Sequence, residues 1–253
     1  MSGAIPMWHR PSYQATDRRV AVAIFAFSEQ PLTSGVPLVA ARYGIPSAVA
    51  MSSVHVRGRS PSKDKLDDWR HGAFREVAEM QLSDLGPLDA ARHEFGITVD
   101  TPDRADLGYL QGSWAAAKWL VDRGCSVVFD LHAARWYDRA TIGAWPGDRP
   151  FDFDTEASVI IETGGTDNMV HTRGMIKFAR PDVLVRAGAL SSGFARRVVH
   201  DVAEMMAAGY VHPRNTVFRI DGVPRFRLVR YEPDVNAPQV NLNNDGLLLV
   251  PDE

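Results

Sequence analysis

The residues best suited to chemistry lie in one short segment that runs from His171 to Asp182. If this segment is an extended strand, His171, Arg173 and Lys177 project from one face, because successive side chains of a strand alternate between its faces. An imidazole, a guanidinium and an ammonium group on one face would hold a carboxylate, a phosphate or the acidic surface of a partner protein. In an enzyme, His171 would act as the acid-base group and Arg173 and Lys177 as anion anchors.

A structural interpretation of the same cations is also open. The preceding segment, residues 153–163, alternates apolar and acidic residues, and the two segments are predicted to form a hairpin. Glu162 and neighbouring carboxylates would then lie opposite the cations as ordinary cross-strand ion pairs. In the functional interpretation, Glu162 and Asn243 are instead expected to help bind the ligand.

Asp130 and His132 form a second candidate pair. Being two positions apart, they would share one face of a strand, as an acid-imidazole pair or as two ligands of a metal ion. A catalytic metal needs a third protein ligand, such as Glu162 or His171, and the spacing does not supply one. We therefore predict that Asp130 and His132 bind the ligand without a metal ion or another cofactor.

Trp136 begins a stretch rich in Trp, Gly and Pro, residues 136–150, which is predicted to be a long connecting loop. Its aromatic rings would either line a ligand pocket or cover the core. Four arginines of a predicted C-terminal hairpin are expected on its outer face, where they discourage sheet-to-sheet association. These are Arg219, Arg225, Arg227 and Arg230.

The segment from Thr172 to Asp182 resembles a motif, T-R-G-M-x-K-F-x-x-P-[DE], of a bacterial family known as domain-of-unknown-function family 4261. The order of the predicted elements is also similar, and the similarity weakens toward both ends of the chain. The resemblance implies an ordered bacterial domain. It implies no catalytic role, because the family has no established activity. The matching residues are Thr172, Arg173, Gly174, Met175, Lys177, Phe178, Pro181 and Asp182.

Composition argues against several classes of protein. With 253 residues, of which 45% are hydrophobic, the chain can bury a substantial core. A net charge of -3 argues against binding of nucleic acid or of a membrane surface, because proteins that bind these usually carry a basic excess. The motifs of P-loop, dinucleotide-binding, zincin and α/β-hydrolase proteins do not occur in the sequence.

The single cysteine, Cys125, excludes an intramolecular disulfide and fits a cytoplasmic protein. We predict a buried, unreactive thiol at this position. We predict neither a membrane span nor a secretory signal, because the sequence shows no apolar stretch of the length that either requires. The expected partner is a small anionic ligand or another protein, and an open strand edge would suit a homodimer.

Periodicity predicts the elements that position these residues. Strands do not alternate strictly with helices, which predicts an α+β fold with mixed or antiparallel sheets and helices on one face. The order of the elements suits two ferredoxin-like halves. Strands are predicted over 19–27, 48–56 and 125–131, and helices over 66–80, 102–123 and 192–208.

We predict a flexible N-terminus over residues 1–17, unless Trp8 is docked, an N-terminal half over 18–135 and a C-terminal half over 151–253. One compact domain is the alternative. The expected function is binding of an anionic small molecule or an acidic protein surface through the cationic strand. The alternative function is an enzyme of unrecognised class.

Overall fold

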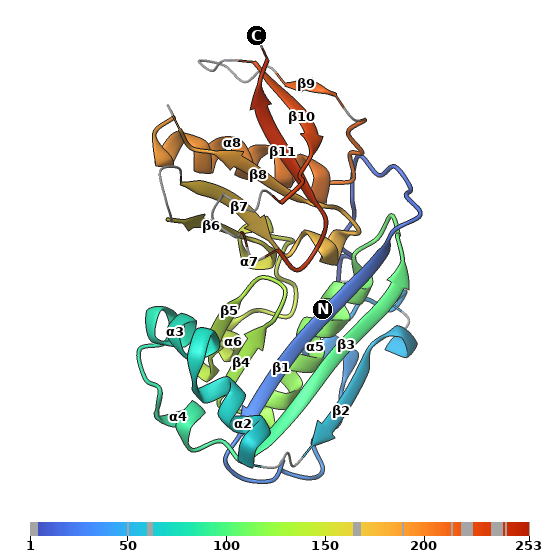
Figure 1. Cartoon of the computed structure of the whole chain (residues 1–253). Helices are drawn as coiled ribbons and strands as arrows, with labels where there is room; N and C mark the ends of the chain where they lie inside the picture. The colour runs from blue at the N-terminus through green and yellow to red at the C-terminus, as the bar shows by residue number, and fades with distance from the viewer. Residues whose placement is uncertain are drawn as a thin grey trace. The chain divides into compact units, whose positions relative to one another are not determined.

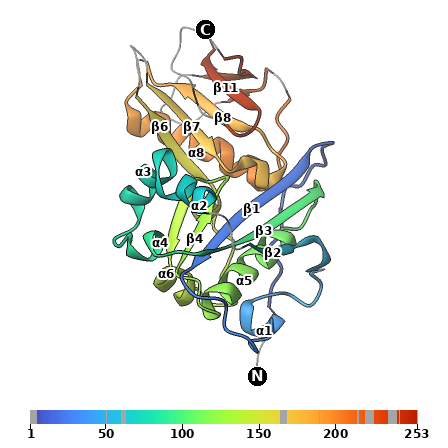
Figure 2. The ribbon, with the colours of Figure 1, turned by 60° about the horizontal axis from the view of Figure 1, so that its bottom comes forward.

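Contacts divide the chain into two units in the computed structural model (Figures 1 and 2). Unit 1 comprises residues 1–9, 21–101 and 106–151, and unit 2 comprises residues 10–20, 102–105 and 152–253. The structure describes residues 5–49, 51–59, 63–163, 168–188, 190–213, 215–218, 225–233, 240 and 242–252. Helices accompany two sheets, so the predicted α+β class is confirmed.

The sheet of unit 1 has the strand order β2-β3-β1-β4-β5. Strand β1 lies between β3 and β4, and β3 lies between β1 and β2, so each crossover spans one intervening strand. This is the split β-α-β arrangement of ferredoxin-like folds, with β5 added at one edge. The strands are β1 (Arg19–Ser28), β2 (His55–Arg59), β3 (His93–Pro102), β4 (Val127–Asp130) and β5 (Arg135–Asp138).

Helices cover both faces of the unit 1 sheet, which corrects the prediction of helices on one face. Trp136 and Tyr137 are neighbours on β5 and therefore point to opposite faces. The Trp136 ring packs against Trp69 of α2, whereas the Tyr137 ring packs against Trp114 of α5. The helices of unit 1 are α1 (Ala40–Tyr43), η1 (Met51–Ser53), α2 (Lys63–Arg70), α3 (Gly72–Gln81), α4 (Gly86–Asp89), α5 (Gly108–Asp122) and α6 (Arg139–Ala144).

Several local predictions for unit 1 are wrong. The strand predicted over 48–56 begins only at His55, after the 3-10 helix η1, and the helix predicted over 102–123 begins only at Gly108. The helix predicted over 66–80 is divided into α2 and α3 at Gly72, whose φ of +63° favours glycine. The stretch 136–150, predicted as a loop, contains most of β5 and all of α6.

The six-stranded sheet of unit 2 has the order β6-β7-β8-β11-β10-β9. Strands β8 and β11 are parallel, and the other pairs are antiparallel. Helix α8 packs on β6, β7 and β8. The elements are α7 (Phe153–Glu156), β6 (Ser158–Glu162), β7 (Met169–Arg173), η2 (Met175–Phe178), β8 (Asp182–Arg186), α8 (Ser192–Ala207), β9 (Val217–Phe218), β10 (Phe226–Arg230) and β11 (Gly246–Pro251).

This topology confirms some predictions for unit 2 and corrects others. The pairing of β6 with β7 confirms the predicted hairpin, whose turn at 164–167 lies outside the described residues. Residues 153–156, predicted as the start of its first strand, instead form α7. Helix α8 confirms the helix predicted over 192–208, and Ser191 caps it, because its hydroxyl accepts a hydrogen bond from the Phe194 N–H at 3.4 Å. The ferredoxin-like prediction is wrong here, because β6, β7 and β8 follow one another in both sequence and sheet.

Trp8 is docked, which is the exception that the prediction of a flexible N-terminus over 1–17 allowed. In unit 1, Trp8 is 5% exposed and its indole N–H donates to the Arg149 carbonyl at 3.0 Å. In unit 2, the Ser12 N–H donates to the Ala208 carbonyl at 3.0 Å. None of the helices in the described ranges is long and apolar enough to cross a membrane.

Candidate functional site

The segment from His171 to Asp182 is not one continuous strand. Strand β7 ends at Arg173, and Gly174, with φ of +107°, turns the chain into the 3-10 helix η2. Lys177 therefore lies on η2, and the predicted strand face shared by His171, Arg173 and Lys177 does not exist.

His171 and Lys177 are buried and bonded within unit 2. The His171 ring lies with Nε2 at 3.1 Å from Glu162 Oε1 and Nδ1 at 3.0 Å from the Thr172 carbonyl oxygen. Both ring nitrogens thus lie beside acceptor oxygens of the protein. Lys177 Nζ lies 3.0 Å from Glu156 Oε2, and both side chains are fully buried. These contacts fit the structural interpretation of the two cations.

Asp182, at the end of the motif, is also buried. Its Oδ1 accepts a hydrogen bond from the Thr172 hydroxyl at 2.9 Å, and the same hydroxyl accepts from the Val183 N–H at 2.9 Å. Burial raises the pKa of Asp182 to about 7. The hydrogen bonds from Thr172 and Met175 stabilise the carboxylate and oppose this rise, but burial has the larger effect. Thr172 and Asp182 thus join β7 to the start of β8.

Asp130 and His132 do not share a strand face. Strand β4 ends at Asp130, whose Oδ1 accepts hydrogen bonds from the backbone N–H groups of His132 at 3.1 Å and Ala133 at 3.2 Å. These bonds hold a turn in which Ala134 has φ of +51°. In the described ranges, no three His, Cys, Asp or Glu side chains lie close enough to hold a metal ion.

The remaining predicted residues are distributed over both units. Trp136 belongs to the core of unit 1, where its indole N–H donates to the Phe74 carbonyl at 3.1 Å. Asn243 lies in unit 2, three residues before β11. Cys125 is buried as predicted, and burial raises the pKa of its thiol to about 12.

A cavity of about 330 Å³ in unit 2 was not predicted from the sequence. It lies where β8 and β11 begin and where β10 and α8 end. We call it the arginine cavity. Its lining residues are Thr16, Arg18, Arg180, Pro181, Met206, Val211, His212, Arg230, Asp245, Gly246 and Leu247.

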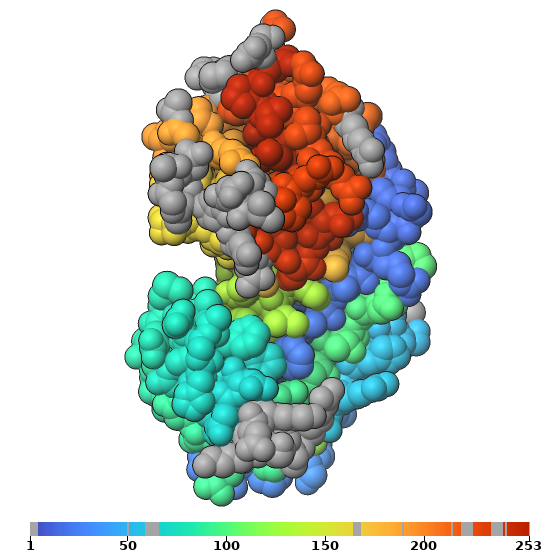
Figure 3. Space-filling model, in the orientation of Figure 1, coloured from blue at the N-terminus to red at the C-terminus, as the bar shows by residue number. Residues whose placement is uncertain are grey.

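The lining of the arginine cavity is strongly cationic. Three guanidinium groups, those of Arg18, Arg180 and Arg230, face a single carboxylate, that of Asp245. The local charge is thus positive, although the whole chain carries a net charge of -3. Charges of one sign around a concave surface attract ligands of the opposite sign. Figure 3 shows the last strands of unit 2 (red) at the surface.

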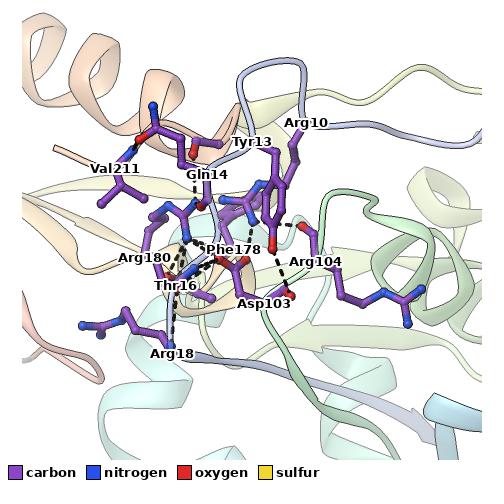
Figure 4. A network of polar contacts seen from close by, with 12 residues as sticks. Arg10, Tyr13, Gln14, Thr16, Arg18, Asp103, Arg104, Phe178, Arg180 and Val211 are labelled. Atoms are coloured by element: carbon purple, nitrogen blue, oxygen red, sulfur yellow. Dashed lines mark hydrogen bonds and ion pairs between the residues drawn. The ribbon is translucent and has the colours of Figure 1, made fainter.

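Arg180 contributes charge to the cavity, while its hydrogen bonds go to the protein (Figure 4). It is 1% exposed, and its Nε donates to the Tyr210 carbonyl at 3.2 Å. One terminal nitrogen donates to Asp103 at 2.8 Å and the other to the carbonyls of Gln14 and Gly209 at 2.8 and 2.9 Å. Arg180 is therefore a fixed part of the wall.

Asp103 joins Arg180 to a second buried arginine, Arg10 (Figure 4). The Asp103 oxygens lie 2.6 Å from Arg10 and 2.8 Å from Arg180, and all three side chains are buried. Burial opposes ionisation of Asp103, but the bond and charge of Arg180, the charge of Arg10 and the bond from Thr16 outweigh it and lower its pKa. One carboxylate thus balances two guanidinium groups, which leaves an excess positive charge beside the cavity.

Arg18 and Arg230 are the arginines with room for a ligand. Arg230 is exposed, and no carboxylate of the described residues pairs with its guanidinium group. Arg18 is bonded to Asp245 Oδ2 at 3.0 Å and to Asn244 Oδ1 at 2.9 Å, both in the polar segment before β11.

His212 is a further polar group of the cavity lining. Its ring packs edge-on against Phe218, with centroids 4.8 Å apart. Its Nε2 is buried and has no hydrogen-bond partner in the part of the chain that the structure describes. Burial lowers the pKa of His212, so the ring is neutral at pH 7 and can present one N–H group.

Sequence reasoning missed this site because its residues come from five separate segments. Arg230 was predicted on the outer face of a hairpin, together with Arg227, which instead pairs with Asp252. Arg219 lies outside the described residues. The available signal was that Arg18, Arg180 and Arg230 each lie next to a strand end, but nothing in their spacing indicates that they converge.

No protein-family model, curated protein or solved structure matches this chain. The family resemblance of the segment from Thr172 to Asp182 therefore stays a prediction. The function has to be argued from the site itself.

Proposed function

We propose that this chain binds a small anionic molecule in the arginine cavity of unit 2. The proposal rests on one observation, which is that three guanidinium groups and a neutral imidazole line a cavity of about 330 Å³ against one carboxylate. It keeps the predicted class of ligand and replaces the predicted cationic strand with a cavity built from separate segments.

The cationic side chains of the cavity would contribute to binding in different ways. Arg230 would donate charge-assisted hydrogen bonds, which are roughly twice as strong as neutral ones. Arg180 would act at short range through charge alone, because its own bonds go to Asp103 and backbone carbonyls.

The same contacts favour binding over catalysis. The Thr16 hydroxyl, which lines the cavity, is bonded to Asp103 Oδ2 at 3.0 Å and is not poised as a nucleophile. His171, the predicted acid-base group, is fully buried and bonded to Glu162 and the Thr172 carbonyl. The function supported best is therefore recognition of an anion.

Isothermal titration with sodium sulfate at constant ionic strength tests this proposal. Sulfate is a suitable probe because it does not titrate near neutral pH. We expect saturable binding to the wild-type protein. The substitution Arg230→Gln should weaken it by about tenfold or more, since a hydrogen bond to a charged group contributes about 1.5–3 kcal/mol.

The matched control is Arg225→Gln, because Arg225 is exposed, belongs to the same C-terminal segment and does not line the cavity. It should bind sulfate as the wild type does. Absence of saturable binding to the wild type, or equal weakening by both substitutions, would contradict the proposal.

A further inference from the structure

The wall of the arginine cavity already contains a carboxylate at one of its guanidinium groups. Asp245 Oδ2 lies 3.0 Å from an Arg18 terminal nitrogen, and the Asp245 side chain is 68% exposed. Exposed ion pairs of this kind contribute at most about 1 kcal/mol, so another anion can displace Asp245 at little cost. Asp245 shows that the Arg18 guanidinium accommodates a group of carboxylate size.

Four of the other lining residues are apolar. Pro181, Met206, Val211 and Leu247 contribute carbon atoms to the cavity surface. A volume of about 330 Å³ corresponds to roughly ten water molecules in the liquid. A small inorganic anion would occupy only part of this space and would leave the apolar side chains in contact with water. The cavity therefore suits a ligand that has an apolar body as well as a charged group.

We propose that the ligand is an amphiphilic carboxylate, whose charged group replaces Asp245 at Arg18 and whose alkyl or aryl body contacts Met206, Val211 and Leu247. This inference rests on the proposed function. In the bound state, Arg18 and Arg230 hold the carboxylate, and Asp245 is released into solvent. Asp245 thus competes with the ligand and sets the threshold concentration for binding.

A series of straight-chain carboxylates tests the apolar part. Acetate, butanoate, hexanoate and octanoate are titrated at constant ionic strength. We expect affinity to rise by up to about fourfold for each methylene group that is buried, and to level off when the cavity is full. If hexanoate binds no more tightly than acetate, the ligand has no apolar body and the inference is wrong.

A substitution in the lining locates the effect. Val211→Thr keeps the shape of the side chain but adds a hydroxyl group, so it should weaken hexanoate several-fold and leave sulfate unchanged. Val217→Thr is the matched control, because Val217 is 46% exposed on β9 and does not line the cavity. Equal behaviour of the two variants toward hexanoate would overturn the assignment of the apolar body to this cavity.

A second substitution tests the competition. Asp245→Asn keeps a group that can accept a hydrogen bond from Arg18 but removes its negative charge, so both sulfate and hexanoate should bind several-fold more tightly. Asp201→Asn, an exposed site on α8 that does not line the cavity, removes the same charge elsewhere and should change neither affinity. Unchanged affinity in Asp245→Asn would overturn the competition.

The outcomes separate this inference from the proposed function. Sulfate binding that depends on Arg230, combined with no effect of chain length, would leave the proposed function standing and overturn the amphiphilic ligand. If the wild-type protein binds neither sulfate nor any of the carboxylates, the proposed function and the amphiphilic ligand are both wrong.

Discussion

Arg180 and Arg230 line the same cavity, and their surroundings give them different tasks. Arg180 is almost fully buried, and its donors are bonded to Asp103 and to backbone carbonyls. Arg230 is exposed at the end of β10 and has no ion pair with any described residue. The first arginine supplies a fixed charge, and the second can make new hydrogen bonds. Burial and bonding partners, which a single sequence does not reveal, decide between these roles.

Asp182 makes a prediction about stability at this scale. Its pKa is about 7 in the folded state and about 3.9 in an unfolded chain. The folded state therefore holds this proton more tightly, so the stability gained from it is complete below about pH 3.9 and is lost as the pH rises to about 7. Asp182→Asn cannot titrate and should escape this loss.

Urea unfolding at pH 5 and pH 7 measures the effect. The variant should gain stability relative to the wild type between these two pH values, by at most about 1.4 kcal/mol per pH unit. Comparison with the wild type at each pH cancels the groups that both proteins share. If the difference in unfolding free energy between the variant and the wild type is the same at pH 5 and pH 7, Asp182 is already ionised in the folded protein at pH 5.

At the scale of elements, two arginines donate hydrogen bonds to carbonyl groups at the end of α8 and just after it. The last carbonyl groups of a helix lack partners within the helix. Arg10 donates to the carbonyls of Met206 and Ala207 at 3.3 and 3.0 Å, and Arg180 donates to that of Gly209 at 2.9 Å. Because Asp103 holds both guanidinium groups, one carboxylate fixes the segment before β1, the end of α8 and the chain after η2 within unit 2.

Asp103→Asn tests this arrangement. The substitution leaves two buried guanidinium groups without a carboxylate, and breaking a buried ion pair costs about 3–5 kcal/mol. Urea unfolding followed by circular dichroism should show a loss of this size. Asp122→Asn is the control, because its partner Arg42 is 60% exposed and this ion pair should contribute less than about 1 kcal/mol. Equal losses in both variants would show that the buried network does not determine stability.

Sequence periodicity predicted elements well where one pattern ran without interruption. Strand β1, helix α8 and the hairpin of β6 and β7 all follow clear apolar patterns. The prediction failed at Gly174, because a single glycine with positive φ ended the strand on which the predicted site depended. Local patterns do not reveal such turns, since glycine also occurs within strands.

At the scale of the whole chain, the composition gives no indication of the arginine cavity. A net charge of -3 is a sum over the whole chain, and it averages over a cavity in which three arginines face one aspartate. The cavity is built from residues that lie between positions 16 and 247, and only the fold of unit 2 brings them together. A single sequence shows which residue types are present. Only the three-dimensional structure shows that residues so far apart in the sequence line one cavity.

A crystal grown without sulfate and then soaked in sodium selenate tests the central claim most directly. Selenate has the shape and charge of sulfate, and the anomalous signal of selenium marks its position. We predict a peak in the arginine cavity, within hydrogen-bonding distance of Arg230. Selenate peaks on other surface arginines, with none in this cavity, would contradict the assignment of the anion site.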